Sequence, residues 1–221
     1  MPSMDPNGTP YDERIVRTAL TLIEREGWHA LSLLALAKAA KVTLAELYSI
    51  APDKEHLLQV LTAALDKDIL AHLSHADIQG EPKDRVFDAV LSVFEALSPR
   101  KNVMQVLYHD LRRDPWVWRQ AWRGLNGTSA WIADAAGLDT SGMAGALRVR
   151  SIALLLADTT PVWLKDGEDL GRTMAHVDRR LRLAQRWMWW TKSRNRASRP
   201  FEPAADDATD FPETPRADHN I

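Results

Sequence analysis

Hydroxyl and ammonium side chains that can contact phosphate oxygens are concentrated near the N-terminal end of the sequence. Ser32, Lys38, Lys41 and Thr43 lie close together, and Lys54 follows soon after. Lysine ammonium groups and Ser or Thr hydroxyls are frequent partners of the DNA backbone. Lys38, Lys41 and Lys54 could supply a small positive face for such contact. The full predicted set for DNA contact is Ser32, Lys38, Lys41, Thr43, Leu44, Tyr48 and Lys54.

The stretch from Leu31 to Leu58 must position these side chains, and its spacing predicts three short helices joined by two tight turns. Ser32 can cap the first helix. Thr43 and Glu46 form a capping box for the second helix, which must end before Pro52, and Asp53 can cap the third. The middle joint has the dimensions of a helix-turn-helix. Its first helix would bury Leu33, Leu36, Ala37 and Ala40, and its second would bury Leu47.

This stretch resembles the DNA-binding domain of TetR-type bacterial regulators. The shared features are a serine start, an Ala-Ala-Val/Thr turn, a Leu-Tyr pair and a Pro-x-Lys-Glu step. The resemblance implies an all-α, TetR-like protein with an N-terminal three-helix helix-turn-helix domain and a C-terminal helical bundle that binds a ligand and forms a homodimer. The positions that fit are Ser32, Ala37, Ala40, Val42, Thr43, Leu47, Tyr48, Pro52, Lys54 and Glu55.

The sequence departs from the family pattern in and around the second helix. Lys41 stands where the family usually has glycine, Leu44 where it usually has a basic or small polar residue, and Ile50-Ala51 where it often has His-Phe. Residues 43–51 contain no Lys, Arg, Asn or Gln to read base edges, and residues 11–64 contain six Lys and Arg against seven Asp and Glu. Binding that relies on counterion release needs a positive face, which only Lys38, Lys41 and Lys54 offer here.

The whole sequence favours a chain of one or two domains with a sizeable core. It has 221 residues, 45% of them hydrophobic, a net charge of −2 and no cysteine, so disulfides and thiolate metal sites are excluded. We find no secretory signal and no stretch of roughly 18 apolar residues that could span a membrane, and we expect a cytoplasmic protein. We divide it into a flexible N-terminus (1–9), the helix-turn-helix domain (10–52), a long connecting helix (53–80), a ligand-binding and dimerisation domain (81–190) and a disordered tail (191–221).

The spacing of apolar residues in the region 81–190 predicts a series of amphipathic helices, and the region has an unusual number of tryptophans. We expect breaks at Ser98-Pro99, at Asp114-Pro115 and at Asn126-Gly127. Apolar, aromatic-lined sites between the helices of a bundle commonly bind small molecules, although tryptophans also serve as ordinary core residues. The residues that we predict to contact an apolar small molecule or lipid are Leu107, Trp118, Trp122, Trp131 and Trp163.

A final helix, expected from about Asp169 to Trp190, carries an apolar seam opposite a row of arginines. Such a helix can pack in the core or in a dimer, and it can also rest on an anionic membrane surface. The predicted dimer or membrane face consists of Leu170, Met174, Val177, Leu181, Trp187 and Trp190.

The segment from Asp166 to Trp187, with the preceding Trp163-Leu164, is also similar to the C-terminal helices of the lipid-binding accessory protein of coenzyme Q (ubiquinone) biosynthesis, itself TetR-like. Asp166 and the run Asp178-Arg179-Arg180-Leu181 carry this similarity. It implies an alternative function, in which the protein binds lipid or contacts a membrane peripherally and no longer reads DNA.

Catalytic patterns are absent from the sequence: it has no phosphate-binding loop, dinucleotide fingerprint, nucleophile elbow or zinc-protease motif. We predict no enzymatic activity and no cofactor. Asp68, His72 and His75 have a spacing compatible with a metal, but no fourth ligand is evident, and we interpret them as a solvated helix face.

Overall fold

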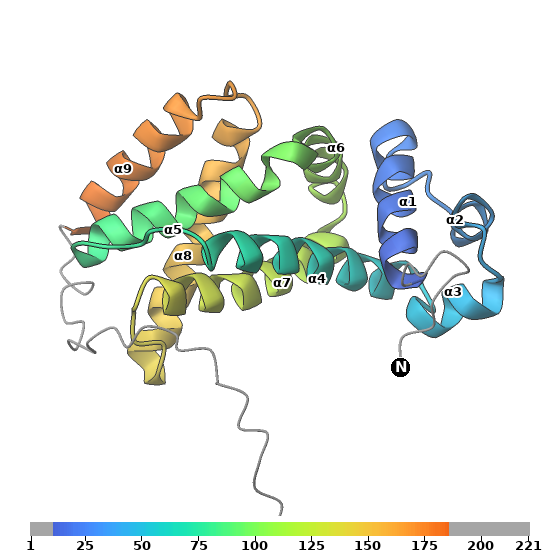
Figure 1. Cartoon of the computed structure of the whole chain (residues 1–221), viewed down its shortest axis with the longest axis horizontal. Helices are drawn as coiled ribbons and strands as arrows, with labels where there is room; N and C mark the ends of the chain where they lie inside the picture. The colour runs from blue at the N-terminus through green and yellow to red at the C-terminus, as the bar shows by residue number, and fades with distance from the viewer. Residues whose placement is uncertain (1–10, 186–221) are drawn as a thin grey trace, which may run out of the picture.

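The computed structural model describes residues 11–185, and this part of the chain is helical, with no strand (Figure 1). It contains nine α-helices and one short 3-10 helix, η1. Their bounds are α1 (Tyr11–Glu26), α2 (Leu33–Ala40), α3 (Leu44–Ile50), α4 (Lys54–Leu73), α5 (Pro82–Leu97), η1 (Ser98–Arg100), α6 (Lys101–Leu111), α7 (Pro115–Ala135), α8 (Gly142–Trp163) and α9 (Gly171–Gln185). The structure confirms the all-α prediction. The predicted flexible N-terminus and disordered tail lie outside the described residues.

The capping residues near the N-terminal end act as the sequence predicts. The Ser32 hydroxyl accepts a hydrogen bond from the Ala35 amide at 3.1 Å and starts α2. Thr43 and Glu46 form the capping box of α3: the Thr43 hydroxyl accepts from the Glu46 amide, and the Glu46 carboxylate accepts from the Thr43 amide. Asp53 caps α4. These caps fix α2 and α3 as separate helices joined by a tight turn.

Lys41 forms that turn in a left-handed conformation, with φ 54°. Glycine adopts this conformation most readily, which explains why a glycine is common at such a helix end. The Lys41 amide donates to the carbonyl oxygens of Ala37 and Lys38. The turn therefore forms although Lys41 stands where the family usually has glycine.

Two hydrophobic cores stabilise the described chain, and α4 contributes to both. The first core joins α1, α2, α3 and the beginning of α4 to the inner face of α6. Three buried residues of α6 complete this core, namely Val103, Leu107 and Leu111. The helix-turn-helix unit is therefore packed directly against an element that follows it by more than forty positions in sequence.

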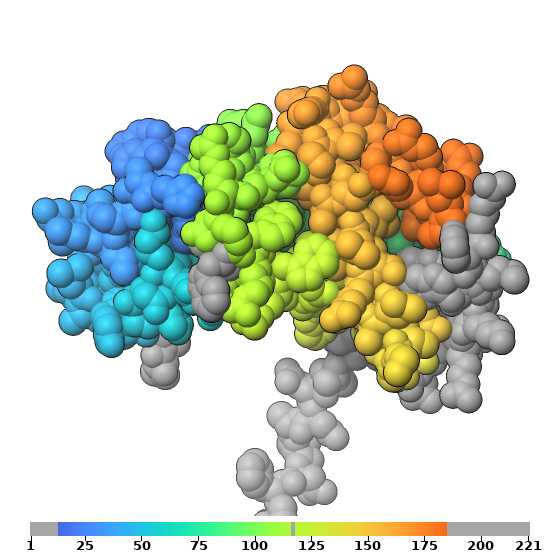
Figure 2. Space-filling model, turned by 180° about the vertical axis from the view of Figure 1, so that it is seen from behind, coloured from blue at the N-terminus to red at the C-terminus, as the bar shows by residue number. Residues whose placement is uncertain are grey.

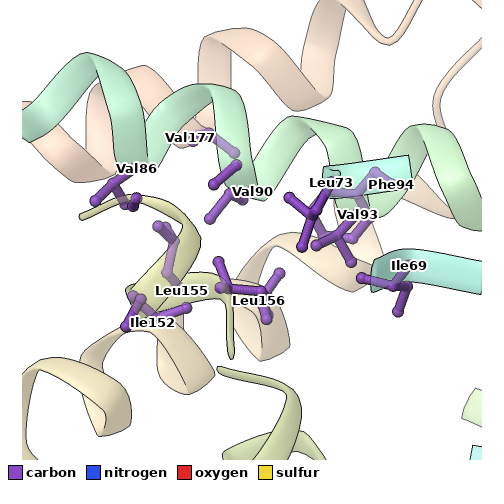
Figure 3. Close-up of a cluster of buried hydrophobic side chains, with 14 of the residues drawn as sticks. Ile69, Leu73, Val86, Val90, Val93, Phe94, Ile152, Leu155, Leu156 and Val177 are labelled. Atoms are coloured by element: carbon purple, nitrogen blue, oxygen red, sulfur yellow. The ribbon is translucent and has the colours of Figure 1, made fainter. Parts of the chain in front are cut away.

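The second core fills the space between α5, α8 and α9, with α7 and the end of α4 alongside (Figure 3). Val86 and Val90 of α5 face Ile152 and Leu155 of α8, and Val177 of α9 covers the other side of α5. The α-helices 5, 8 and 9 thus form the end of the molecule opposite α2 and α3 (Figure 1).

The structure corrects one predicted break. We expected a helix interruption at Asn126-Gly127, but α7 continues from Pro115 to Ala135 without one. The Asn126 side chain donates to the Trp122 carbonyl one turn earlier, at 2.8 Å. The dipeptide favours a hairpin turn only between strands, and the surrounding helical periodicity prevails here.

Candidate nucleic-acid interface

The outer surface of α2 and α3 exposes most of the residues predicted to contact DNA. Leu44 and Tyr48 of α3 lie one turn apart and are 55% and 69% exposed. Lys38 and Lys41 are also exposed and lie at the end of α2 and in the turn that follows it. We call this surface, made by Leu34, Lys38, Lys41, Leu44 and Tyr48, the α2–α3 face. It occupies one end of the molecule (Figure 1).

Leu34 belongs to this face, although the sequence analysis did not select it. Its side chain is 51% exposed, and it precedes Lys38 by one helical turn. The sequence signal was available, because the buried residues Leu36, Ala37 and Ala40 place Leu34 on the opposite side of α2.

The electrostatics of the α2–α3 face are mixed. Ser32 and Thr43 are exposed, but their hydroxyls are engaged in the caps of α2 and α3. The Glu46 carboxylate is held at the start of α3 by both the amide and the hydroxyl of Thr43, at 2.7 and 2.8 Å. Positive charge therefore comes from Lys38 and Lys41, and α3 itself presents apolar and aromatic groups rather than charged base readers.

Lys54 makes contacts within the chain and does not belong to the α2–α3 face. Its ammonium group donates to the Trp28 carbonyl at 2.7 Å and lies 4.9 Å from the centre of the Trp28 ring. Burial lowers the pKa of Lys54. These contacts hold the α1–α2 loop on the start of α4. Contact of Lys54 with DNA stays a prediction.

A carboxylate of α6 holds the same loop from the other side. The Trp28 amide donates to Asp110 Oδ2 at 2.8 Å, and His29 Nε2 lies 3.3 Å from the Asp110 carbonyl oxygen. Lys54 and Asp110 thus bind one short loop from two helices. We call the contacts of Trp28 with Lys54 and Asp110 the Trp28 clasp, and it fixes α1 and α2 relative to α4 and α6.

The five residues predicted to contact a ligand are not gathered at one site. Leu107 is buried in the core of the helix-turn-helix unit, and Trp163 is buried in the core of α5, α8 and α9. Trp118 and Trp131 of α7 are exposed, by 38% and 61%, and Trp122 is half-buried. The largest groove that we describe, of about 960 Å³ between α1, α4 and η1, is lined by none of the five.

Trp163 is packed inside the core of α5, α8 and α9. It is fully buried, its ring lies 5.3 Å from that of Phe94, and its Nε1 atom has no hydrogen-bond partner among the described residues. The hydroxyl of Thr159, one turn earlier on α8, is likewise buried and without such a partner. Buried polar groups are nearly always hydrogen-bonded, so two such groups on one helix face are unusual.

Above the Trp163 ring lies Lys101, the first residue of α6. Its ammonium group is 5.6 Å from the ring centre and donates to the Asp166 carbonyl at 2.7 Å. The buried end of α8 is therefore in contact with the helix that closes the helix-turn-helix core.

The predicted dimer or membrane seam of α9 packs largely inside the chain. Leu170, Val177 and Leu181 are buried in the core with α5 and α8, whereas Met174 is 40% exposed. Trp187 and Trp190 lie outside the described residues. Leu170, Val177 and Leu181 are therefore core residues within the chain, which is one of the alternatives that the sequence left open for this helix.

An exposed apolar face lies on α8 instead. Met143, Leu147 and Leu154 are 91%, 54% and 58% exposed, and their spacing of four and seven residues puts them on one side of the helix. We call these three residues the α8 face. Helix α8 packs beside α9, and both helices reach the surface in Figure 2.

The possible metal ligands do not converge. Asp68 pairs with Arg100, His72 lies 3.4 Å from Glu95, and His75 Nδ1 lies 2.8 Å from the Ala71 carbonyl oxygen. Within residues 11–185 no group of three or more His, Asp or Glu side chains could hold a metal ion. In the same part of the chain, none of the helices is both long enough and apolar enough to cross a membrane.

Comparison with known proteins agrees with this geometry. Residues 15–61 match the sequence model of a family described as bacterial regulatory proteins, tetR family. No curated protein matches the chain.

Among solved structures, a TetR transcriptional regulator from Nitrosomonas europaea is 20% identical, with a TM-score of 0.63, and the match covers 81% of this chain and 100% of that one. A TetR transcriptional regulator from Rhodococcus sp. RHA1 is 17% identical, with a TM-score of 0.54 and coverage of 79% and 94%. Residues 15–61 thus match the TetR-family sequence model over the helix-turn-helix region, and the described chain has the fold of TetR-type regulators.

Proposed function

We propose that this protein is a TetR-type transcriptional regulator that binds duplex DNA through the α2–α3 face. The single observation that carries the proposal is the exposure of Leu44 and Tyr48 on a capped α3 within a TetR-family domain. Together with Leu34 they form an exposed group of apolar side chains, and such grouped exposure favours an interaction site more than single exposed residues do.

Phosphate and base contacts divide between the two helices in this proposal. Lys38 and Lys41 contact the DNA backbone and set the position of the domain, whereas Leu44 and Tyr48 enter the major groove and meet thymine methyl groups. Sequence discrimination then rests on apolar contact and DNA shape. Affinity is modest, because the N-terminal unit offers few cations against the charge of Glu46.

The regulator acts as a homodimer through the α8 face. Met143, Leu147 and Leu154 form an apolar stripe, and a two-fold axis through α8 lets this stripe cover its own copy. Two helix-turn-helix units then contact successive half-sites, whose spacing is set by the dimer.

An apolar ligand binds beside α8 at Thr159 and Trp163. The indole Nε1 can only donate a hydrogen bond, so the ligand carries an acceptor such as a carbonyl or ether oxygen. Lys101 contacts the Trp163 ring and begins α6, so a ligand that displaces the ring moves α6 and, through the Trp28 clasp, α1 and α2. The ligand changes DNA affinity only to the extent that it favours one arrangement over the other.

Fluorescence anisotropy with the purified protein tests DNA binding. The probes are duplexes that tile the region upstream of the protein's own gene, with a scrambled duplex beside them, at several salt concentrations. Replacing Lys38 with Gln should weaken binding to all duplexes and reduce the slope of log K against log salt by about 1, whereas Tyr48→Ala should reduce the preference for one sequence.

The matched control is Arg172→Gln, which removes one exposed positive charge from α9 at the far end of the molecule. Its affinity and salt slope should equal those of the unaltered protein. Equal, weak binding of all duplexes, unchanged by Lys38→Gln, would contradict the proposal. An apolar molecule retained on purification would then favour the lipid-binding accessory function that the similarity to the coenzyme Q protein implies.

A further inference from the structure

A groove of about 460 Å³ separates the end of α6 from the end of α8. Its floor is apolar and aromatic, formed by Tyr108, Pro161 and Leu164, and Leu164 and Tyr108 also touch the core of α5, α8 and α9. The groove lies on the opposite side of α6 from Leu107, which is buried in the helix-turn-helix core. No residue predicted from the sequence to contact DNA or a ligand lines it.

The polar lining of this groove is positive. Arg112, Arg113 and Lys165 line it and are exposed, together with His109 and Gln105, and no carboxylate lines it. Among the neighbouring carboxylates, Asp110 accepts from the Trp28 amide, and its Oδ1 atom lies 3.5 Å from Nδ1 of the lining residue His109. Asp166 accepts from the amide and hydroxyl of Thr173.

Neutralising the negative ends of two helices explains only some of these positive side chains. Both α6 and α8 end at the groove, and each C-terminal end carries a partial charge of roughly −0.5 that attracts cations. The three formal positive charges of Arg112, Arg113 and Lys165 face a combined charge of about −1 from the two helix ends, which leaves an excess of roughly two positive charges. The cations therefore exceed what capping the two helices needs.

We propose that the groove between α6 and α8 binds a small organic anion with a flat apolar body, of the aromatic carboxylate class. The carboxylate pairs with Arg113 and Lys165, which come from the two walls, while the ring lies on Pro161, Leu164 and Tyr108. Arg112 already lies over the Tyr108 ring, 5.2 Å from its centre, and completes the positive side. This site is separate from the buried Thr159 and Trp163 groups, which face the core.

The position of the groove connects it to the helix-turn-helix unit. Asp110, adjacent in sequence to the lining residue His109, holds the Trp28 amide, and Leu111 belongs to the helix-turn-helix core. An anion that draws Arg112 and Arg113 toward α8 acts on the same end of α6. The effect on DNA affinity rests on the proposed function, whereas binding of the anion does not.

Isothermal titration calorimetry with 1-naphthoate as the probe tests the site. We expect 1-naphthoate to bind with a Kd of about 1 mM or below, and 1-naphthamide and inorganic phosphate to bind at least roughly fivefold more weakly. Arg113→Gln and Lys165→Gln should each weaken naphthoate binding roughly fivefold, and Lys165→Arg should restore it. The matched control is Arg123→Gln, which removes an exposed charge from α7 outside the groove and should leave the Kd unchanged.

Each other outcome counts against the site. No heat with naphthoate, equal binding of the amide, or equal losses in Arg123→Gln and Arg113→Gln would overturn the proposal. Phosphate binding as tightly as naphthoate would overturn the role of the apolar floor. DNA affinity is measured separately with and without naphthoate, so a protein that binds naphthoate but no duplex contradicts only the proposed regulatory function.

Discussion

Gly27 is the residue at which the helix-turn-helix unit depends most directly on α6. Its φ of +88° lies in the region that favours glycine, and a Cβ there would lie 2.9 Å from Asp110 Oδ2. Glycine thus ends α1 and also admits the carboxylate that holds the Trp28 amide. Gly127, in the middle of α7, differs in both respects, because a Cβ there meets nothing within 4 Å and its φ is not positive.

Alanine at these two glycines should therefore act in opposite directions. Gly27→Ala is expected to lower the free energy of unfolding by about 1–3 kcal/mol, through backbone strain and the displaced Asp110 contact. Gly127→Ala is expected to raise it by about 0.5–1 kcal/mol, because alanine favours a helix interior. Urea denaturation of both variants measures the two changes. A stabilising Gly27→Ala would show that Asp110 does not restrain this loop.

At the residue scale, the sequence identified residue types better than side-chain directions. It predicted the Thr43 and Glu46 capping box, because local spacing fixes that interaction. It did not reveal that Lys54 donates to the Trp28 carbonyl, a partner 26 positions away. That contact depends on how α1 and α4 pack, which local spacing does not contain.

Among the elements, α9 is attached to its neighbours by three carboxylates. Asp158 of α8 accepts two hydrogen bonds from Arg180, at 2.7 and 2.8 Å, and lies 2.6 Å from His176 Nε2. Burial would raise the pKa of Asp158, but these hydrogen bonds outweigh it and lower the pKa. The pKa values of Asp166 and Asp178, which contact Thr173 and Lys83, are also lowered.

The attachment of α9 should weaken in acid. A carboxylate whose pKa is lower in the folded than in the unfolded state adds stability above the unfolded pKa of about 3.9 and loses it as pH falls through the folded pKa. Asp158→Asn should therefore reduce Tm by about 2 °C near pH 7 and by less near pH 3, because the pairs are partly exposed. Asp134→Asn on exposed α7 is the control in thermal unfolding. A difference that persists undiminished near pH 3 would contradict this account.

Helix bounds were largely predictable, because caps and breakers are local signals. Asp53 begins a helix and Ser98-Pro99 ends one where the sequence predicted. The failure at Asn126-Gly127 has a physical cause: one glycine costs a helix only about 1 kcal/mol, which the burial of Ile132 and Ala133 on the same helix offsets. The separation of Trp118, Trp131 and Trp163 could not be predicted from the sequence, since their positions depend on helix packing.

For the whole molecule, the α8 face predicts self-association. Leu147→Glu combined with Leu154→Glu should convert a dimer of twice 24.9 kDa into a monomer, because two carboxylates would be buried against their own copies. Light scattering after gel filtration measures the mass. Leu34→Glu is the matched control, since it alters an equally exposed leucine on the α2–α3 face and should leave the mass unchanged. A dimer that survives both α8 substitutions would place the interface elsewhere.

The shared core of α6 with α1–α4 also limits how TetR-type proteins of this kind can be recombined. A chimera that joins residues 1–80 to a foreign sensory module would lose Val103, Leu107 and Leu111. Burial of each of these side chains contributes about 1.5–3 kcal/mol, and without them the core of α1–α4 would be exposed to water. Transferring α6 together with α1–α4 keeps this core complete. The helices that would have to be exchanged together are therefore α1–α4 and α6, which are not continuous in sequence. A gene fusion with its boundary between α4 and α6 would separate helices that share one core.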